Sequence, residues 1–253
     1  VFPLSHHYSS STSITFEWNA GSGDPESGID YYGVQAGTAT GEPAIWGVLN
    51  TTTSATFTTI NNCEQATTYY ARVRSKNGAG VYGSWLGPSG DYSITIDTTP
   101  PDGAPSKPQG TYYAGLNLIM FSWTIGTAAD NVSDNAGYRL EVDSDTSFTE
   151  PYSYSVTMDG KDSTTKYVPG LSENITYYAR VKAKNGSGLY GIYSSTSDGV
   201  FTDATPPTDF TLSLLNMQLR SDTSTYYTTS TTTISASWTE SHDPESGIHH
   251  YNV

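Results

Sequence analysis

Cysteine, charged residues and long apolar runs are all scarce in this sequence. Its single cysteine, Cys63, has no partner for a disulfide within the chain, so any core must be held by packing alone. Charged residues make up 14% of the chain, whereas about 25% is usual. No apolar run approaches the roughly 20 residues that a membrane helix needs. The sequence therefore predicts no membrane insertion for this region.

Basic residues are the rarer of the two charged classes. The chain has 11 Lys and Arg against 25 Asp and Glu, for a net charge of −14. Nucleic acid and anionic lipid both need clustered cations, so neither is expected as a partner. Aromatic residues make up 13% of the chain, and disordered segments are poor in them. The composition therefore favours a folded protein whose surface attracts cations.

The sequence repeats itself with a period of about a hundred residues. Residues 68–83 return as residues 176–191, and Asp24-Pro25-Glu26-Ser27-Gly28-Ile29 returns unchanged as residues 243–248. The segment 97–101, Asp-Thr-Thr-Pro-Pro, returns as Asp-Ala-Thr-Pro-Pro at 203–207. Repeats of this kind indicate tandem domains. We predict one unit at 1–98, whose first strand is open to being incomplete, a second at 99–204, and the N-terminal half of a third at 205–253. The natural chain is expected to continue past Val253.

Apolar residues alternate with polar ones along the predicted strands. This alternation places one set of side chains in the core: Ile14, Phe16, Trp18; Ile119, Phe121, Trp123; Ile234, Ala236, Trp238; Tyr69, Ala71, Val73; and Tyr177, Ala179, Val181. Clean alternation between turn signals is typical of antiparallel sandwiches. The fold class predicted is all-β, as tandem antiparallel β-sandwiches. The Pro-Pro pairs at 100–101 and 206–207 favour semi-rigid linkers, and hence a rod.

These motifs together resemble a known family. A core Trp on the second strand, Tyr-x-Val on the third and Tyr-x-Ala-x-Val-x-x-x-Asn-Gly-x-Gly near the end of a unit are similar to the fibronectin type III fold, which is immunoglobulin-like. Tyr69 and Tyr177 fall where that family has its tyrosine corner. The Asp-Pro-Glu-Ser-Gly-Ile turn and the Asp-x-Thr-Pro-Pro linker look like the version in long prokaryotic cell-surface proteins. The second unit departs from this turn, because it has Asp130-Asn131-Val132-Ser133-Asp134-Asn135-Ala136-Gly137.

Acidic residues gather in the turns and linkers that the resemblance places at the ends of units. They are Asp24, Glu26, Asp97, Asp130, Asp134, Asp203, Asp243 and Glu245. Carboxylates that cluster repel one another unless a cation joins them, and Ca²⁺ takes six to eight oxygen ligands. One hypothesis is therefore a junctional Ca²⁺ that stiffens the rod, with no other cofactor. The alternative, which we favour, is that these residues are good turn formers and nothing more.

Two further motifs have a structural and a functional interpretation. Gly78-Ala79-Gly80-Val81-Tyr82-Gly83 matches the dinucleotide-binding pattern, but that pattern needs a following helix, and strands flank it here. We interpret these glycines as hairpin residues. Trp85 aligns with Tyr193 and is interpreted as a structural aromatic. Trp46 has no core assignment and is the one candidate for stacking on a sugar.

No catalytic motif is found: there is no His-Glu-x-x-His, no Gly-x-Ser-x-Gly and no phosphate-binding Lys loop. We therefore predict a protein that is not an enzyme. The leading hypothesis is an extracellular structural or adhesive region, as a stalk, surface-layer or fibre component. The alternative is an accessory spacer or carbohydrate-binding module of a secreted polysaccharide-degrading enzyme. The expected partners are other copies of the chain or neighbouring repeats, with a host surface or a glycan as further candidates.

Overall fold

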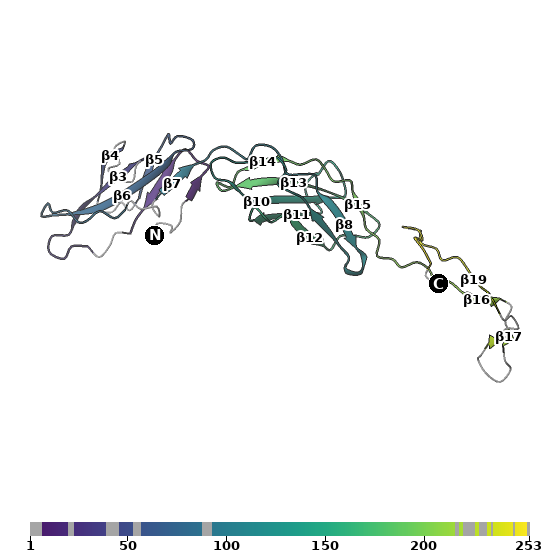
Figure 1. Cartoon of the computed structure of the whole chain (residues 1–253). Helices are drawn as coiled ribbons and strands as arrows, with labels where there is room; N and C mark the ends of the chain where they lie inside the picture. The colour runs from purple at the N-terminus through teal and green to yellow at the C-terminus, as the bar shows by residue number, and fades with distance from the viewer. Residues whose placement is uncertain are drawn as a thin grey trace.

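The chain is built almost entirely from β-strands, which form separate groups along its length (Figure 1). The computed structural model describes residues 7–19, 23–38, 46–52, 57–87, 93–215, 218–219, 226–227, 232–233, 235–244 and 246–251. Strands β1 to β7 lie in the first predicted unit, β8 to β15 in the second and β16 to β19 in the third; these units are called the first, second and third repeats. In the described ranges no helix has the length and apolarity to cross a bilayer. The all-β prediction is confirmed.

The second repeat is a sandwich of two antiparallel sheets. One sheet has the order β12-β9-β8, and the other has the order β11-β10-β13-β14, with β15 paired to β13. The strands are β8 (Gln109–Tyr113), β9 (Leu118–Ser122), β10 (Asn135–Asp143), β11 (Tyr154–Asp159), β12 (Thr165–Pro169), β13 (Thr176–Asn185), β14 (Tyr190–Tyr193) and β15 (Val200–Phe201). A short 3-10 turn, η2 (Ala114–Leu116), connects β8 to β9.

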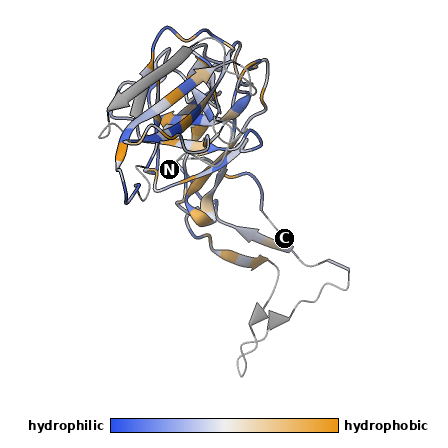
Figure 2. Cartoon of the chain, turned by 90° about the vertical axis from the view of Figure 1, so that its left-hand side faces the viewer, coloured by the Kyte–Doolittle hydropathy of each residue, from blue (hydrophilic) through white to orange (hydrophobic). Residues whose placement is uncertain are grey.

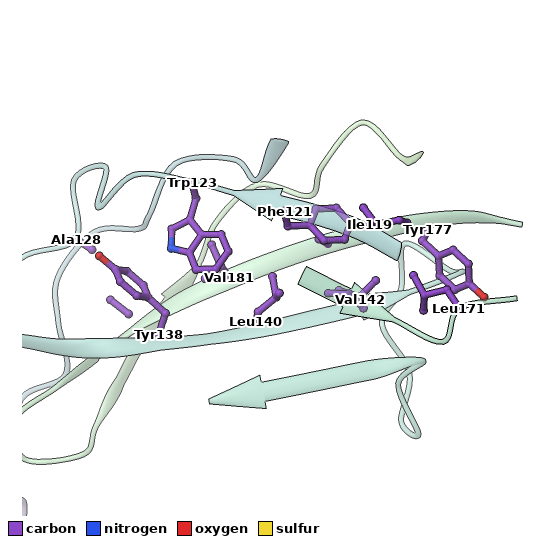
Figure 3. Packing of buried hydrophobic residues seen from close by; sticks show 13 residues of the cluster. Ile119, Phe121, Trp123, Ala128, Tyr138, Leu140, Val142, Leu171, Tyr177 and Val181 are labelled. Atoms are coloured by element: carbon purple, nitrogen blue, oxygen red, sulfur yellow. The ribbon is translucent and has the colours of Figure 1, made fainter. Parts of the chain in front are cut away.

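The core of the second repeat lies between these sheets. Alternate side chains of β10, β13 and β9 with the residue that follows β9 are buried in it: Tyr138, Leu140, Val142; Tyr177, Ala179, Val181; and Ile119, Phe121, Trp123 (Figure 3). Trp123 meets Tyr138 edge to face, with ring centroids 5.7 Å apart. Aromatic pairs in this geometry add to the stabilisation that burial provides. Figure 2, viewed from the side of the first repeat, shows hydrophobic and hydrophilic residues interspersed along the strands.

The first repeat is a similar sandwich, but its first strand, β1, forms one edge of the larger sheet. Its larger sheet has the order β1-β7-β6-β3-β4, and β2 pairs with β5 in the smaller one. The strands are β1 (His7–Ser9), β2 (Ile14–Glu17), β3 (Ile29–Gly37), β4 (Trp46–Thr52), β5 (Phe57–Ile60), β6 (Thr68–Asn77) and β7 (Ser93–Ile96). Strand β1 runs parallel to β7. Trp18 is buried and meets Tyr32 edge to face at 5.8 Å.

A tyrosine closes the same corner of both sandwiches. The backbone N–H of Glu64 donates to the Tyr69 hydroxyl at 2.9 Å, and that of Ser172 donates to the Tyr177 hydroxyl at 3.0 Å. Both tyrosines are buried, so each hydroxyl gives an otherwise unpaired loop N–H an acceptor inside the fold. The structure thus places Tyr69 and Tyr177 at the corner that the sequence resemblance implied.

The third repeat corrects one part of the core prediction. Strand β16 (Leu212–Leu215) pairs with β19 (Ser235–Trp238), and β17 (Gln218–Leu219) pairs with β18 (Tyr226–Tyr227). Trp238 is 40% exposed, so its assignment to the core is wrong for the structure described. The physical reason is that the described residues place no second sheet over β16 and β19. Trp238 instead packs against Tyr251, with ring centroids 5.8 Å apart.

The different burial of the three tryptophans gives a matched test. We expect Trp123→Ala to destabilise the second repeat by about 3–5 kcal/mol, because it removes a buried ring and leaves a cavity. That loss is comparable to the whole stability of a small domain, which is about 5–15 kcal/mol. Trp238→Ala, at an exposed ring, is the control and should leave the main thermal transition unchanged. Equal melting curves for the Trp123 variant and the parent would contradict this core.

Candidate functional site: the joint between the first two repeats

One turn is used three times in the chain. In each copy an Asp carboxylate accepts a hydrogen bond from the backbone N–H of the Ser three residues later: Ser27 to Asp24 at 2.7 Å, Ser133 to Asp130 at 2.8 Å and Ser246 to Asp243 at 2.8 Å. Asp side chains commonly close turns in this way. The following residue, Gly28, Asp134 or Gly247, has a φ of 67°, 57° or 75°.

The second copy of the turn departs in sequence from the other two but shares their geometry. Asp134 stands where the other copies have glycine. Asp is one of the few residues with a side chain that enters the left-handed region readily. The turn from Asp130 to Ser133 therefore has the same backbone form as the others despite its different sequence.

The hairpin asparagine of each complete repeat is bonded to this turn. The Asn77 side-chain amide donates to Asp24 at 3.1 Å, and the Asn185 amide donates to Asp130 at 3.0 Å. The amide oxygen of Asn185 accepts from the backbone N–H of Leu189 at 2.9 Å, which holds the hairpin loop closed. The Gly-rich motif is thus a loop between strands, as interpreted from the sequence, and no helix follows it.

The carboxylate of Asp97 lies where the first repeat meets the second. It is completely buried, with 0% of its surface exposed. From the first repeat and the linker, Oδ1 accepts hydrogen bonds from Gln65 Nε2 at 3.1 Å, Thr99 N at 3.2 Å and Thr99 Oγ1 at 3.0 Å. From the second repeat, Oδ2 accepts from Ser133 Oγ at 2.5 Å and Asn185 Nδ2 at 2.9 Å. A single side chain therefore binds both repeats and the segment between them.

Neighbouring contacts hold the linker and both repeats around Asp97. The backbone N–H of Asp97 donates to the carbonyl of Ser9 on β1, and the Asn185 amide donates to the carbonyl of Thr99, at 2.8 and 2.9 Å. Gly186 lies so close to the first repeat that a Cβ there would be 3.2 Å from a ring carbon of Tyr8. The two repeats are thus in direct contact at this joint.

Neutral donors, rather than a cation, compensate the charge of Asp97. Burial raises the pKa of Asp97, but the hydrogen bonds from Ser133, Gln65 and Thr99 outweigh it and hold the pKa below its usual 3.8. Hydrogen bonds to the ionised form of a carboxyl group favour that form. In the described ranges no Lys, Arg or His forms an ion pair with Asp97. The joint therefore depends on the oriented hydroxyl and amide groups around the carboxylate.

The structure brings together only some of the predicted calcium ligands. Asp97 and Asp130 both bind the Asn185 amide. The other described members lie apart from this pair: Asp134 pairs with Lys161, Asp203 accepts from Thr205 N, and Asp24, Glu26 and Asp243 lie in the turns of their own repeats. Glu245 lies outside the described residues. No group of three or more His, Cys, Asp or Glu in the described ranges is placed to hold a metal ion, and junctional Ca²⁺ stays a prediction.

Sequence reasoning missed three residues of the joint. Gln65, Ser133 and Asn185 supply its side-chain donors from outside the linker, and none was predicted to act there. A signal existed for two of them. Ser recurs at the same place in all three turns, as Ser27, Ser133 and Ser246, and Asn recurs in both hairpins.

The outer face of each larger sheet carries stacked cations and aromatic rings. In the first repeat the Arg74 guanidinium lies 4.4 Å from the ring centroid of Trp85 and 3.9 Å from that of Tyr82. In the second, Arg180 lies 4.0 Å from the Tyr193 ring and 4.4 Å from the Phe148 ring. Such contacts stabilise a protein by about 0.5–1 kcal/mol each at exposed sites. Trp85 and Tyr193 thus occupy matching structural positions.

A buried glutamate fixes this stack in the second repeat. Glu141, 1% exposed, accepts hydrogen bonds from Arg139, Arg180 and the Tyr193 hydroxyl, at 2.9, 2.9 and 2.6 Å. Burial raises the pKa of Glu141, but the bonds from Tyr193 and Arg180 outweigh it and leave the pKa below its ordinary value. Burial and the Glu141 charge together raise the pKa of Tyr193.

The backbone of Trp46, the candidate for sugar binding, is in β4, and its side chain lies outside the described residues.

Comparison with known proteins found one family model that matches part of the chain and several solved structures that are similar to it. The fibronectin type III domain model matches residues 4–89. Solved structures similar to the chain include the FN1-FN3 domains of chicken CNTN1, with a TM-score of 0.49 at 18% identity over 78% of this chain and 65% of that one. The sixth fibronectin type III domain of a human protein, fibronectin type III domain containing protein 3, has a TM-score of 0.33 at 23% identity, over 44% and 93%.

A three-domain titin structure has a TM-score of 0.43 at 18% identity, over 79% of this chain and 61% of that one. The chain thus spans less than two thirds of the CNTN1 and titin structures. No curated protein matches the sequence. The fibronectin type III domain model thus matches most of the first repeat, and the second repeat is likewise a sandwich of two antiparallel sheets.

The buried carboxylate gives a specific mutational prediction. We expect Asp97→Asn to loosen the joint, because an amide cannot accept from Asn185 and Gln65 at once and one of these donors loses its acceptor. Losing a hydrogen bond to a charged group costs about 1.5–3 kcal/mol. Small-angle X-ray scattering should show a broader distribution of maximum dimensions.

Asp203→Asn is the matched control for that variant. Asp203 occupies the equivalent position after the second repeat but accepts only from Thr205 N among the described residues. Its scattering profile should match that of the parent. Equal profiles for the Asp97 variant and the parent would show that the carboxylate does not hold the repeats together.

The joint should also respond to acid. Because the pKa of Asp97 is lowered by folding, its contribution to stability is present above the unfolded value of 3.8 and is lost as the pH falls through the lower folded value. We expect the fixed inter-repeat geometry of the parent chain to weaken progressively as the pH falls below about 3.8 and to be lost only below the folded pKa of Asp97. Scattering recorded from pH 6 to about pH 2 measures this, and Asp97→Asn should show a flatter profile over that window.

Proposed function

We propose that the chain is a non-catalytic structural region of an extracellular or cell-surface protein, which acts as a stiff spacer in a stalk, fibre or surface layer. The observation that carries this proposal is the joint at Asp97. A buried carboxylate with five donors from two repeats and their linker fixes one domain against the next. Flexibly linked domains need no such arrangement, because short polar linkers alone would connect them.

The comparisons support the same class of function. Fibronectin type III domains are commonly non-catalytic structural or adhesion modules, typically in extracellular or surface proteins, and the family model matches the first repeat. A fold alone does not fix a function, because the same scaffold serves many roles. The proposal therefore rests on the joint. Because the turn and the linker resemble those of long prokaryotic cell-surface proteins, we also expect a prokaryotic origin.

A sugar-binding function has less support from the described residues. Aromatic rings bind sugars by presenting an open face, but Trp85, Tyr82, Tyr193 and Phe148 have Arg74 or Arg180 stacked on them. One face of each of these rings is therefore occupied by a cation of the chain itself. The accessory module of a polysaccharide-degrading enzyme is therefore the alternative, with Trp46 as its remaining candidate residue.

Two measurements test the proposal. Antibody labelling of intact cells that produce the protein should equal the labelling of permeabilised cells, since a surface spacer is accessible from outside. Scattering from the purified chain should give an elongated particle with the first two repeats in one fixed arrangement. Labelling seen only after permeabilisation, or two repeats that move independently, would rule out the stiff surface spacer.

A further inference from the structure

The smaller sheet of the second repeat, β12-β9-β8, has an apolar outer face. Ile119 and Phe121 of β9 and Val168 of β12 are buried in the core, and Tyr112 of β8 packs against it. Because successive side chains of a strand point to opposite faces, the residues that alternate with these lie on the outer side of the sheet. We call this side the apolar flank. It consists of Gln109, Thr111, Tyr113, Leu118, Met120, Ser122, Thr165, Tyr167 and Pro169.

Two tyrosines form a raised pair on the apolar flank. Tyr113 lies opposite Leu118 on one side of β9, and Tyr167 lies opposite Met120 on the other side. The two rings lean toward each other across β9, with centroids 6.4 Å apart, and the Tyr113 hydroxyl lies 3.9 Å from the Met120 sulfur. Tyr113 and Tyr167 are 39% and 54% exposed, whereas Leu118 and Met120 are half-buried. The flank therefore presents aromatic surface to solvent.

The sandwich itself does not require this surface. In the first repeat the positions equivalent to Met120 and Tyr167 hold Thr15 and Thr59, which also lie opposite each other. Their hydroxyls are hydrogen-bonded to one another at 2.9 Å. In the third repeat the position of Met120 holds Ser235. The apolar flank is thus a feature of the second repeat alone, and the first repeat forms its two sheets without one.

Charge favours a second copy of this chain as the partner of the apolar flank. The chain has a net charge of −14, yet none of the nine flank residues is charged. Two copies that met through acidic surface would repel each other, whereas this face brings no carboxylates together. A cationic partner would instead be attracted to the acidic remainder of the surface. Tyr and Met are also enriched, and Asp and Glu depleted, where proteins contact one another.

We propose that the apolar flanks of two copies pack against each other as a symmetric pair. A two-fold axis makes every contact twice, so Tyr113 of each copy meets Tyr167 of the other. The face is suited to this symmetry because it carries two rings of the same kind, one on each side of β9. Sheets that pack face to face in proteins cross at about 30° and lie about 10 Å apart, which leaves room for these rings to interdigitate.

The size of the apolar flank sets the strength of the contact. Five residues on each of three strands cover about 17 Å by 14 Å, or about 250 Å² of flat sheet in each copy. The relief of the side chains adds to this area but leaves it below the roughly 800 Å² per partner of a standard interface. We therefore expect a weak pair, which forms at about 0.1–1 mM protein. Such a contact suits chains that are already held side by side.

This inference goes beyond the proposed spacer, because it concerns lateral pairing and does not depend on the joint at Asp97. Sedimentation equilibrium with complementary variants tests it. Tyr167→Glu and Tyr113→Lys each place an unpaired charge in the contact, so each variant alone is expected to stay monomeric up to about 1 mM. In an equimolar mixture the introduced lysine faces the introduced glutamate, and dimers should return.

Thr59→Glu is the matched control. It places the same charge at the equivalent, exposed position of the first repeat, so it should pair like the parent chain. Because Tyr113 and Tyr167 are exposed, the thermal melts of their variants should match that of the parent, and return of dimers in the mixture shows independently that both variants are folded.

Four results would overturn the proposal: a parent chain that is monomeric at every concentration up to about 1 mM, a Tyr167→Glu variant that pairs as the parent does, a mixture that stays monomeric, or loss of pairing in Thr59→Glu. A monomeric parent with an elongated scattering profile would assign the apolar flank to a different molecule and leave the single-chain spacer intact. Pairing between chains whose first two repeats move independently would remove the stiff spacer and keep the pair, so the two ideas fail separately.

Discussion

The arrangement of the first two repeats depends on one ionised carboxylate held out of water. Transferring a carboxylate into a protein interior is costly unless hydrogen bonds replace its hydration. Asp97 receives those bonds from Gln65, Thr99, Ser133 and Asn185, and no single element provides them all. The charge is therefore compensated only when the first repeat, the linker and the second repeat are in their observed places. The desolvation cost thus acts as a constraint on geometry.

The two linkers of the chain differ in the side chains that surround their aspartate. The Asp-x-x-Ser turn is built in every repeat, and the Asp-x-Thr-Pro-Pro segment follows both complete ones. Only the first joint has Gln65 beneath the linker, because Glu173 stands at the equivalent place in the second repeat. A glutamate beside Asp203 would bring a second negative charge and offers no amide donor. The amide of Gln65 therefore donates to Asp97 in the first joint, whereas the carboxylate of Glu173 cannot donate to Asp203 in the same way.

Strands and cores could be predicted from the sequence, whereas the joint could not. Inward-facing residues such as Phe121 and Tyr138 recur at every second position, and this period follows directly from the pleat of a strand. The donors to Asp97 that lie outside the linker have no period, because they are 32, 36 and 88 positions away from it. The acidic residues were visible, but whether neutral donors or a cation compensate them depends on which loops the fold brings together. The core assignment of Trp238 failed although its local pattern is that of a core strand. The described residues supply no second sheet to cover it.

The parallel pairing of β1 with β7 has a mechanical consequence for the first repeat. Tension along the chain pulls the N-terminal end of β1 and the C-terminal end of β7 in opposite directions, parallel to both strands. Their contacts, from His7 opposite Ile94 to Ser9 opposite Ile96, are then loaded in shear and share the force. An antiparallel hairpin pulled from its open end would separate one bond at a time. The first repeat is therefore oriented to resist stretching along the axis on which the repeats are joined.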